Sequence, residues 1–319
     1  MKVAVAGASG KLGQEVISLL LKKNVHTIAI LRAGSKANMP KGAIMRFADY
    51  GNSASLKEAL HGATHIINLT GSVAAHLGLD KLRAANVQPT KMLLEAAPAN
   101  LQDFIHISSI AVYGKNLEGE CNESCPRNAD NAYAKAKLEG ERLALSYAGK
   151  FRVIILQPGI IYGPQFSEGF FEILRQLQKK KMRIIGSGKN FMPLVHVHDV
   201  AQAIFSCLSA KVQSGSTYLL VAQPQLTQKE LMEMAAKELG VSPPRKSVNY
   251  SIANFLALFE ESKARLFGGR AKLTSDMVEQ IYCSRKFSCQ KAKKELKWSP
   301  AVPFKTGIEQ VVIEFKSSR

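Results

Sequence analysis

The first thirteen residues, which read MKVAVAGASGKLG, restrict the fold of this chain more than any other stretch. Residues 2–6 form an apolar run that is too short for a helix and is bounded by glycine, which predicts a buried strand. Gly7, Gly10 and Gly13 follow, and residues 12–21 have the apolar spacing of an amphipathic helix. A strand, a turn with three glycines and a helix are typical of a dinucleotide-binding unit.

Each part of this turn has a predicted role. Gly7 permits the tight turn, Gly10 lets a pyrophosphate approach the backbone, and Gly13 lets the helix pack close to the strand. The N–H groups and the dipole at the helix start would hold the phosphates. An ordinary glycine turn is the alternative, and the strand directly before the turn favours nucleotide binding. The predicted contacts are Gly7, Ser9, Gly10, Lys11, Leu12 and Gly13.

Length and composition are those of an ordinary globular protein. A chain of 319 residues can form one large domain or two that are closely joined. Its 46% hydrophobic and 21% charged residues are typical of such proteins. No apolar run approaches the ~20 residues of a membrane-spanning helix, and no signal-peptide pattern is visible. We therefore expect a cytoplasmic protein.

The formal net charge of +18 is the one unusual global feature. Such a charge suits nucleic acid, an acidic membrane surface or an anionic substrate as partner. Here the basic residues are spread along the chain, and the densest clusters, at 179–181 and 291–294, are small. We favour a lysine-rich solvated surface and expect no specific nucleic-acid partner.

Cysteine and histidine patterns argue against a metal site. The five cysteines are odd in number and form no CxxC pair, so we expect reduced thiols. His196 and His198 alternate as metal ligands can, but no cysteine or acid stands in register with them. We interpret these histidines, and His106, as packed structural residues and expect no metal ion.

Strand and helix patterns alternate through the first half of the chain. Further strands are predicted at 25–31, 43–48, 65–69, 104–108 and 152–156. Helices are predicted between them at 56–60, 77–97 and 132–146, the second kinked at Pro89. This alternation predicts a doubly wound, parallel α/β sheet of the Rossmann type with helices on both faces.

The pattern changes after residue 163, where helices come to dominate. They are predicted at 170–180, 200–208, 228–239, 252–267, 289–296 and 305–315. Strands at 194–197 and 217–221 flank the second of these helices, for which Asp199 is the expected N-cap.

Two domains follow from this division. We predict a dinucleotide-binding domain over 1–165, to which 194–221 returns, and a smaller, mostly helical substrate domain from 166–193 and 222–319. The substrate domain would close over the carboxyl edge of the sheet, where ligands of open α/β sheets bind.

Arg32, at the end of the second strand, bears on the choice of cofactor. A carboxylate at this point binds the ribose 2′-hydroxyl of NAD, whereas an arginine accommodates the 2′-phosphate of NADP. With Lys36 behind it and Lys11 in the glycine turn, Arg32 favours NADP(H) over NAD(H). The alternative is that all three are exposed bases of a basic protein. Asp49 is placed to meet the adenine, and Gly71 lets a chain end lie against the cofactor.

Tyr133 and Lys137 stand four residues apart on one predicted helix, so their side chains share a face. Ser109 lies at a strand end and can face that helix across the cleft. A nearby ammonium lowers the pKa of a phenol, so Tyr133 could exchange a proton while a cofactor moves hydride. Ser109 could hydrogen-bond a substrate carbonyl oxygen. We predict that these three residues are catalytic.

Together these motifs resemble the extended short-chain dehydrogenase/reductase family over nearly the whole chain. The glycine turn is similar to the family's cofactor loop, and 106–114, 157–164 and 195–201 resemble three further segments of it. One departure is Gln157, which stands where an arginine is common and predicts the loss of a structural ion pair. The resemblance implies a Rossmann fold and the catalytic trio Ser109, Tyr133 and Lys137. It also implies cofactor contacts from Leu69, Thr70, Gly71, Tyr133, Lys137, Pro158 and Ile161.

Three classes within that family compete for the function. They are ketone or alcohol dehydrogenases of the steroid and dihydroflavonol type, nucleotide-sugar epimerases or dehydratases, and non-catalytic proteins that bind RNA or larger complexes. Residues 166–180 are apolar and lack an asparagine for a sugar nucleotide's diphosphate, and no carboxylate pair follows Ser109. We therefore favour an NADP(H)-dependent oxidoreductase that acts on a small, apolar substrate. The substrate, the reaction direction and the oligomer, a homodimer among others, stay open.

The predicted helix over 252–267 begins with a crowded apolar face. Ile252, Phe255, Leu256, Leu258 and Phe259 lie near Lys263 and Arg265. An apolar helix with basic flanks suits weak contact with an acidic membrane surface. Apolar stripes are more often core, so we favour packing of this face against the substrate domain.

Overall fold

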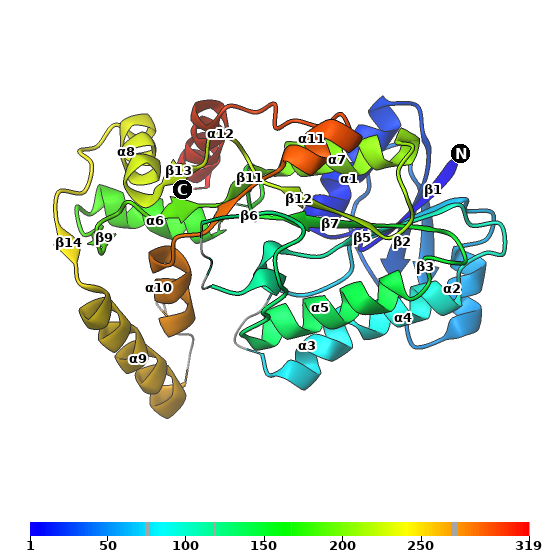
Figure 1. The fold of residues 1–319 in the computed structure, drawn as a ribbon, viewed down its shortest axis with the longest axis horizontal. Helices are drawn as coiled ribbons and strands as arrows, with labels where there is room; N and C mark the ends of the chain where they lie inside the picture. The colour runs from blue at the N-terminus through cyan, green and yellow to red at the C-terminus, as the bar shows by residue number, and fades with distance from the viewer. Residues whose placement is uncertain (74–76, 116, 118, 167, 269–273, 319) are drawn as a thin grey trace.

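The computed structural model describes residues 1–73, 77–115, 117, 119–166, 168–268 and 274–318. A seven-stranded parallel sheet forms its centre (Figure 1). The strands are β1 (Lys2–Ala6), β2 (His26–Arg32), β3 (Ile44–Ala48), β4 (His65–Asn68), β5 (Asp103–Ile107), β7 (Arg152–Pro158) and β12 (Ser216–Leu220). Their order is β12-β7-β5-β4-β1-β2-β3. The chain therefore builds outward from β1 in both directions, and the predicted Rossmann-type α/β fold is confirmed.

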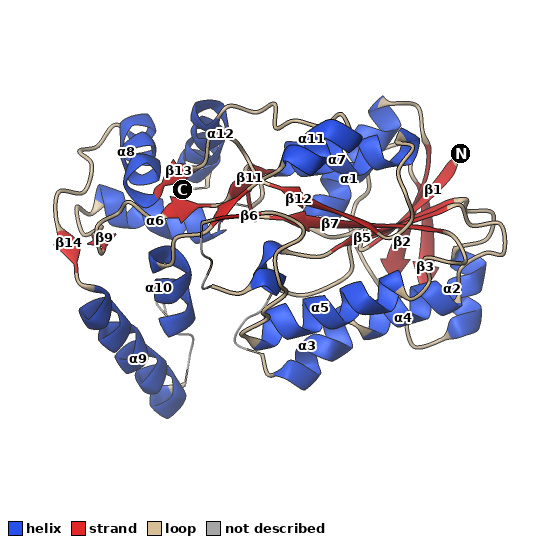
Figure 2. Ribbon diagram, viewed as in Figure 1, coloured by secondary structure: helices blue, strands red, loops and turns tan. Residues whose placement is uncertain are grey.

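Helices cover both faces of this sheet (Figure 2). One face carries α1 (Lys11–Lys22), α7 (Val197–Ser209) and α11 (Gln290–Glu295). The other carries α2 (Ser53–Ala59), α4 (Gln88–Glu95) and α5 (Ala132–Leu145), with α3 (Leu79–Asn86) packed on α4 and α5. Val3 to Ala6 of β1 are all fully buried. A strand that is covered on both sides must be apolar throughout, which is why residues 3–6 do not alternate with polar ones.

A smaller unit lies beyond the carboxyl edge of the sheet (left in Figure 1). Its core is shared by α6 (Glu168–Gln178), α8 (Gln228–Leu239) and α12 (Phe304–Ser317). An arm of α9 (Tyr250–Phe267) and α10 (Ser275–Tyr282) extends from it. Residues 287–298, which the sequence assigned to the substrate domain, contribute Phe287, Leu296 and Trp298 to the core on the sheet side.

Four short strand pairs lie outside the central sheet in the described residues, and a single-turn helix follows β5. The pairs are β8 (Ile160–Tyr162) with β11 (Leu194–His196), β9 (Ile184–Ile185) with β14 (Ser247–Val248), β10 (Phe191–Met192) with β13 (Leu226–Thr227), and β6 (Glu120–Cys121) with β15 (Lys286–Phe287). The single turn, η1, spans Ile110–Tyr113. No helix in the described ranges is long and apolar enough to cross a membrane.

Three local expectations differ from the structure. The helix predicted over 77–97 is divided at Val87, because Pro89 occupies the first turn of a new helix, where a missing N–H costs nothing. Asp199 is not the N-cap of α7: His196 takes that position and accepts a hydrogen bond from the His198 N–H at 3.2 Å. The Asp199 carboxylate instead accepts the Ala301 N–H at 2.9 Å. Helix α10 was not predicted.

The expected packing of the apolar face of α9 is also wrong. Phe255, Leu256 and Phe259 are 69%, 50% and 60% exposed. The side of α9 that packs against α10 is made of small residues, Ala253 and Ala257, which are buried. The large side chains therefore face away from the protein.

Candidate active site

The glycine turn forms a close junction between β1 and α1. Gly7 has a φ of +82°, in the left-handed region that favours glycine. A Cβ on Gly13 would lie 2.4 Å from the Gly7 carbonyl oxygen, so only glycine lets the helix start here. The Gly10 N–H donates to the Gly7 carbonyl at 3.0 Å, and Gly10 then caps α1. The result is a helix N-terminus at the carboxyl edge of the sheet, where phosphate groups bind readily.

Two cavities meet at this turn. The larger, of about 560 Å³, extends from the turn to the ends of β5 and β7, and the smaller, of about 470 Å³, extends to the end of β2. Gly7, Gly10, Leu69, Thr70 and Gly71 line both. A groove with the glycine turn at its midpoint fits an extended dinucleotide, with its pyrophosphate at α1 and one nucleoside in each cavity.

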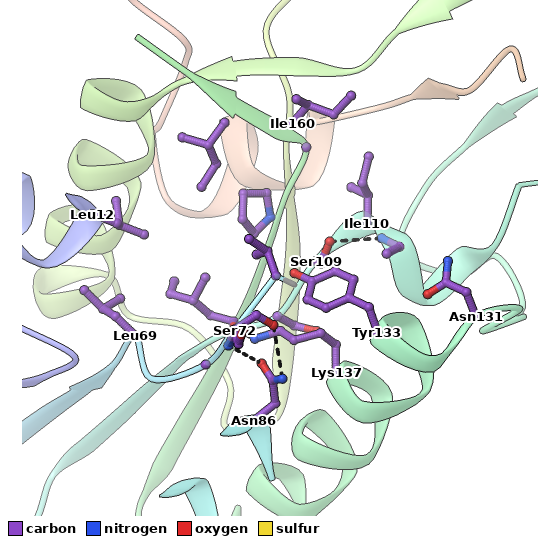
Figure 3. A pocket seen from close by; sticks show the side chains of 18 of the residues that line it. Leu12, Leu69, Ser72, Asn86, Ser109, Ile110, Asn131, Tyr133, Lys137 and Ile160 are labelled. Carbon is purple, nitrogen blue, oxygen red and sulfur yellow. Dashed lines mark hydrogen bonds between the residues drawn. The ribbon is translucent and has the colours of Figure 1, made fainter. Parts of the chain in front are cut away.

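Gly71 lies where β4 gives way to the cavity wall. Its φ is +149°, and a Cβ there would lie 2.4 Å from Oδ1 of Asn86. Asn86, on α3, accepts the Ser72 N–H at 3.2 Å and donates to the Ser72 carbonyl at 3.2 Å (Figure 3). The buried Asn86 side chain therefore fixes the path of the backbone at residues 71–72, where the chain lines the cavity.

The three predicted catalytic residues converge on the larger cavity. Asn131 is the N-cap of helix α5, and its side chain accepts the Ala134 N–H at 2.9 Å, which orients the first turn. Tyr133 and Lys137 then project side by side from α5 toward the cavity (Figure 3). Ser109 caps η1 by accepting the Ala111 N–H at 3.1 Å, and its hydroxyl hydrogen-bonds to that of Tyr133.

Burial controls the protonation of this trio. It raises the pKa of Tyr133, and the hydrogen bond with Ser109 opposes that rise. Burial also lowers the pKa of Lys137 to about 8. The Lys137 ammonium donates to the Ile107 carbonyl oxygen at 2.5 Å. The group that lowers the pKa of Tyr133 is therefore Ser109, whereas the sequence analysis assigned that effect to Lys137.

A buried carboxylate, Glu141, supports the trio from behind. It accepts hydrogen bonds from the Ser108 hydroxyl at 2.7 Å and from Nε2 of Gln157 at 2.9 Å. Nε of Arg127 lies 3.7 Å from it. The ion pair that Gln157 was expected to lack is thus made by Arg127, which comes from a different segment and stacks 4.3 Å above the ring of Tyr113.

Most predicted cofactor contacts line one of the two cavities. The larger is lined by Lys11, Leu12, Gly13, Pro158 and Ile161, and the smaller by Ser9 and Arg32. Asp49, which was expected to meet the adenine, lines neither cavity, and its exposed carboxylate accepts the Gly51 N–H at 2.8 Å. Lys36 is also absent from both linings.

Sequence reasoning missed several lining residues. They are Tyr50 and Lys81 in the smaller cavity and Ser72, Asp276, Gln280 and Arg285 in the larger one. Tyr50 directly follows Asp49, so the strand end itself was a usable signal. Arg285 belongs to no motif and reaches the cavity only through the fold.

His106 and His196 are buried, as expected, but the His198 side chain is 42% exposed. Nε2 of His196 lies 3.1 Å from Gln310, and Nδ1 of His198 lies 2.8 Å from Glu15. Burial strongly lowers the pKa of His106, helped by the charge of Lys137. Among the residues that the structure describes, no group of three or more histidine, cysteine or acidic side chains could hold a metal ion.

Comparisons with known proteins identify the family of this chain. The model of the NAD dependent epimerase/dehydratase family matches residues 3–220. The 4-hydroxy-2-methyl-3-oxo-4-farnesyl-3,4-dihydroquinoline-1-oxide ketoreductase of Stigmatella aurantiaca is 21% identical, over 97% of this chain and 95% of its own. The N-acetyl-alpha-D-glucosaminyl-diphospho-ditrans,octacis-undecaprenol 4-epimerase of Escherichia coli O157:H7 is 22% identical, over 91% of this chain and 88% of its own.

Solved structures show the same fold. The UDP-glucuronic acid 4-epimerase from Bacillus cereus, in complex with NAD, matches with a TM-score of 0.79 and 21% identity, over 100% of this chain and 99% of that one.

Proposed function

Because the chain belongs to the NAD dependent epimerase/dehydratase family, we propose that it is an NADP(H)-dependent oxidoreductase that interconverts a carbonyl and an alcohol. Membership confirms the resemblance to extended short-chain dehydrogenases/reductases and makes the chain an NAD(P)-dependent enzyme. The direction of the reaction, the preference for NADP(H) and the substrate are our proposal.

The convergence of Ser109, Tyr133 and Lys137 on the larger cavity carries this proposal. When bound, the nicotinamide cofactor supplies or accepts hydride. Burial keeps the Tyr133 hydroxyl protonated at neutral pH, so it can donate its proton to a carbonyl oxygen as that oxygen gains charge. Ser109 is close enough to Tyr133 to hydrogen-bond the same oxygen. Lys137 holds a positive charge beneath both groups.

The smaller cavity supports the choice of NADP(H). Ser9, Arg32 and Lys81 line it together, and the Arg32 side chain is exposed. Two cations and a hydroxyl, from β2, α3 and the glycine turn, suit a 2′-phosphate, whereas none of the described residues that line this cavity is a carboxylate that could bind a free ribose hydroxyl. The structure of the UDP-glucuronic acid 4-epimerase holds NAD, and titration of both cofactors decides between NADP(H) and NAD(H) for this chain.

The walls around the catalytic trio support a substrate with an apolar body. Ile110, Ile160, Ile161 and Phe166 line this part of the cavity. The ketoreductase from Stigmatella aurantiaca has a farnesyl group in the name of its substrate. The five free thiols of the chain fit the cytoplasm as its place of action.

A nucleotide-sugar epimerase is the second candidate. The likeness to the 4-epimerases and the polar end of the larger cavity, with Asp276, Gln280 and Arg285, favour it. A dehydratase is less well supported, because Ser109 is followed by Ile110 and Ala111 rather than by carboxylates.

An assay with two arms separates these candidates. Purified protein is given NADPH and a panel of ketones and aldehydes, and NADPH absorbance is followed. In the second arm it is given NAD and UDP-sugars, and the C4 epimers are separated by chromatography. Consumption of NADPH with a carbonyl supports the reductase. Epimer formation without net use of cofactor would replace the proposal by the second candidate.

A further inference from the structure

Arg285 is a buried arginine at the substrate end of the larger cavity. It immediately precedes β15, is only 5% exposed, and lines the cavity with Tyr133 and Ser109. Its Nε is buried without a hydrogen-bond partner. Within the described ranges its side chain forms no ion pair or hydrogen bond.

The nearest carboxylates have other partners. Asp130 accepts the Lys115 N–H at 3.0 Å. Asp276 lies 3.7 Å from Nζ of Lys115 and also accepts a hydrogen bond from Gln280 at 2.6 Å. Burial lowers the pKa of Arg285, and the charges of Asp130 and Asp276, which act over a longer range, oppose this effect only in part. Arg285 stays charged all the same, because a guanidinium does not lose its proton in proteins.

An unpaired buried charge destabilises a fold, and proteins seldom retain one without use. An apolar side chain of similar length, such as methionine, would avoid the cost of burying this charge. What the guanidinium offers is a planar fork of donors, which matches a carboxylate or phosphate better than any other side chain does.

We propose that Arg285 binds an anionic group of the substrate, a carboxylate or a phosphate, while the apolar body of the substrate lies against the isoleucines near the catalytic trio. This inference rests on the proposed function to the extent that the substrate occupies the same cavity. It deepens that function by making the substrate an amphiphile rather than a purely apolar ketone.

The test measures binding rather than turnover. Octanoate, octyl phosphate and octanol are titrated by calorimetry into the wild-type protein loaded with NADP⁺ and into the Arg285→Met variant. We expect at least one anion to bind the wild type more tightly than octanol does, and to lose about tenfold to a hundredfold in affinity in the variant. The two anions distinguish a carboxylate site from a phosphate site. Octanol affinity should stay unchanged.

Lys286→Met is the matched control. It removes the same charge from the next residue, which is 46% exposed at its side chain, pairs with Glu120 and does not line the cavity. This control should keep the anion affinity of the wild type. If it loses as much as Arg285→Met does, the effect is one of net charge and the proposal is overturned.

Stability gives a second readout. Arg285→Met should unfold at the same or a higher temperature without ligand, because it removes a buried charge for which the described residues provide no partner. Arg285→Lys should recover part of the anion affinity. A large fall in the melting temperature of Arg285→Met, or equal binding of octanol and both anions to the wild type, contradicts an anion site. A failure of NADPH turnover with every carbonyl would contradict the proposed function and leave these binding results intact.

A second, independent observation concerns the exposed surface of α9. Ile252, Phe255, Leu256 and Phe259 recur every three or four residues and so form one stripe, which we call the α9 face. Helix α9 contacts the rest of the molecule mainly through α10 and projects from the body (Figure 1). An apolar stripe of this size on the surface of a helix marks a contact site.

The charges around the α9 face favour an anionic surface. Lys263 is exposed and continues the same stripe. Arg245 and Lys246, just before the helix, are also exposed. Helix α9 also carries two acids: Glu261 accepts a hydrogen bond from the Ser275 N–H at 2.8 Å, and Glu260 is half-buried at the edge of the stripe. We infer that the α9 face docks on an anionic lipid surface, into which the aromatic and aliphatic side chains insert while the cations meet the headgroups.

Vesicle sedimentation tests this contact. The protein should bind phosphatidylcholine vesicles that contain phosphatidylserine more than those that do not, and binding should fall as salt rises. Phe255→Glu should abolish binding. Ile313→Glu, a matched change at a 60% exposed residue of α12, should not. Absence of binding at low salt, or a dimer in analytical ultracentrifugation that Phe255→Glu dissociates, would overturn the lipid assignment.

Discussion

Replacement of Arg127 by leucine tests how the loop that borders the cavity is held in place. The Arg127 guanidinium donates to the carbonyl oxygens of Glu123 and Cys125 at 3.0 Å each. It also stacks on Tyr113 and brings a positive charge near buried Glu141. One side chain therefore ties residues 123–127 to the base of the active site.

The expected loss follows from these contacts. Removal of one partner of a buried ion pair costs about 3–5 kcal/mol. The cost is lower here, about 2 kcal/mol, because Glu141 keeps donors from Ser108 and Gln157 and the Arg127 side chain is 22% exposed. At ~2.1 cal/mol/K of unfolding entropy per residue, a chain of 319 residues should melt about 3 °C lower. The KM for substrate should also rise, since Lys115 and Asp130 of the same loop line the cavity.

The rescue variant makes this prediction specific. Gln157→Arg would return a cation to within reach of Glu141, so the double variant should regain at least half of the lost melting temperature. Differential scanning calorimetry of the wild type, both single variants and the double variant completes the cycle. A loss below 1 °C for Arg127→Leu, or strictly additive changes in the double variant, would refute the idea that Arg127 replaces the missing arginine.

Three further changes follow from the described contacts. Arg32→Ala should weaken NADPH binding about tenfold to a hundredfold and leave NADH binding nearly unchanged, which fluorescence titration of both cofactors can measure. Without cofactor, Lys137→Met should be more stable than the wild type, and this advantage should be larger at neutral pH than at about pH 10. The folded wild type releases the Lys137 proton near pH 8, whereas the unfolded chain releases it only near pH 10.5. The stability of the wild type therefore rises between pH 8 and pH 10.5, and the advantage of the variant becomes smaller. Burial raises the pKa of the Asp103 carboxyl, but hydrogen bonds from His65 and Arg152 lower it by more. The net pKa of Asp103 is therefore below its ordinary value. Asp103 therefore stabilises the fold above the pKa of about 3.9 that it has when unfolded, and Arg152→Met should cost more in thermal melts at pH 7 than at pH 3.

Local rules explain what the sequence could predict. Gly7 and Gly13 sit where any Cβ would meet backbone, and such demands are readable from spacing alone. The position of Tyr133 and Lys137 on one face of α5 follows from helical geometry. The parallel sheet could also be predicted from the sequence, because strands that are buried on both faces must be apolar throughout.

Tertiary contacts explain what the sequence could not predict. Asp199 has a typical N-cap side chain, but its carboxylate is drawn to the backbone at 301–302, about a hundred residues away. Gln157 was interpreted as the loss of an ion pair, because nothing in the sequence indicated that Arg127 would reach Glu141. Arg285 became a candidate only when the fold placed it in the same cavity as Tyr133. The apolar face of α9 could be predicted from the sequence, but its exposure could not, because Ala253 and Ala257 form the buried side of that helix.

The most direct test of the central claim is the turnover of Tyr133→Phe. The variant and the wild type are given NADPH and the best carbonyl substrate of the panel, and NADPH binding is measured in parallel. We expect the variant to lose more than about a hundredfold in kcat while its affinity for NADPH stays close to that of the wild type. A variant that keeps a tenth of the wild-type rate would contradict proton transfer by Tyr133.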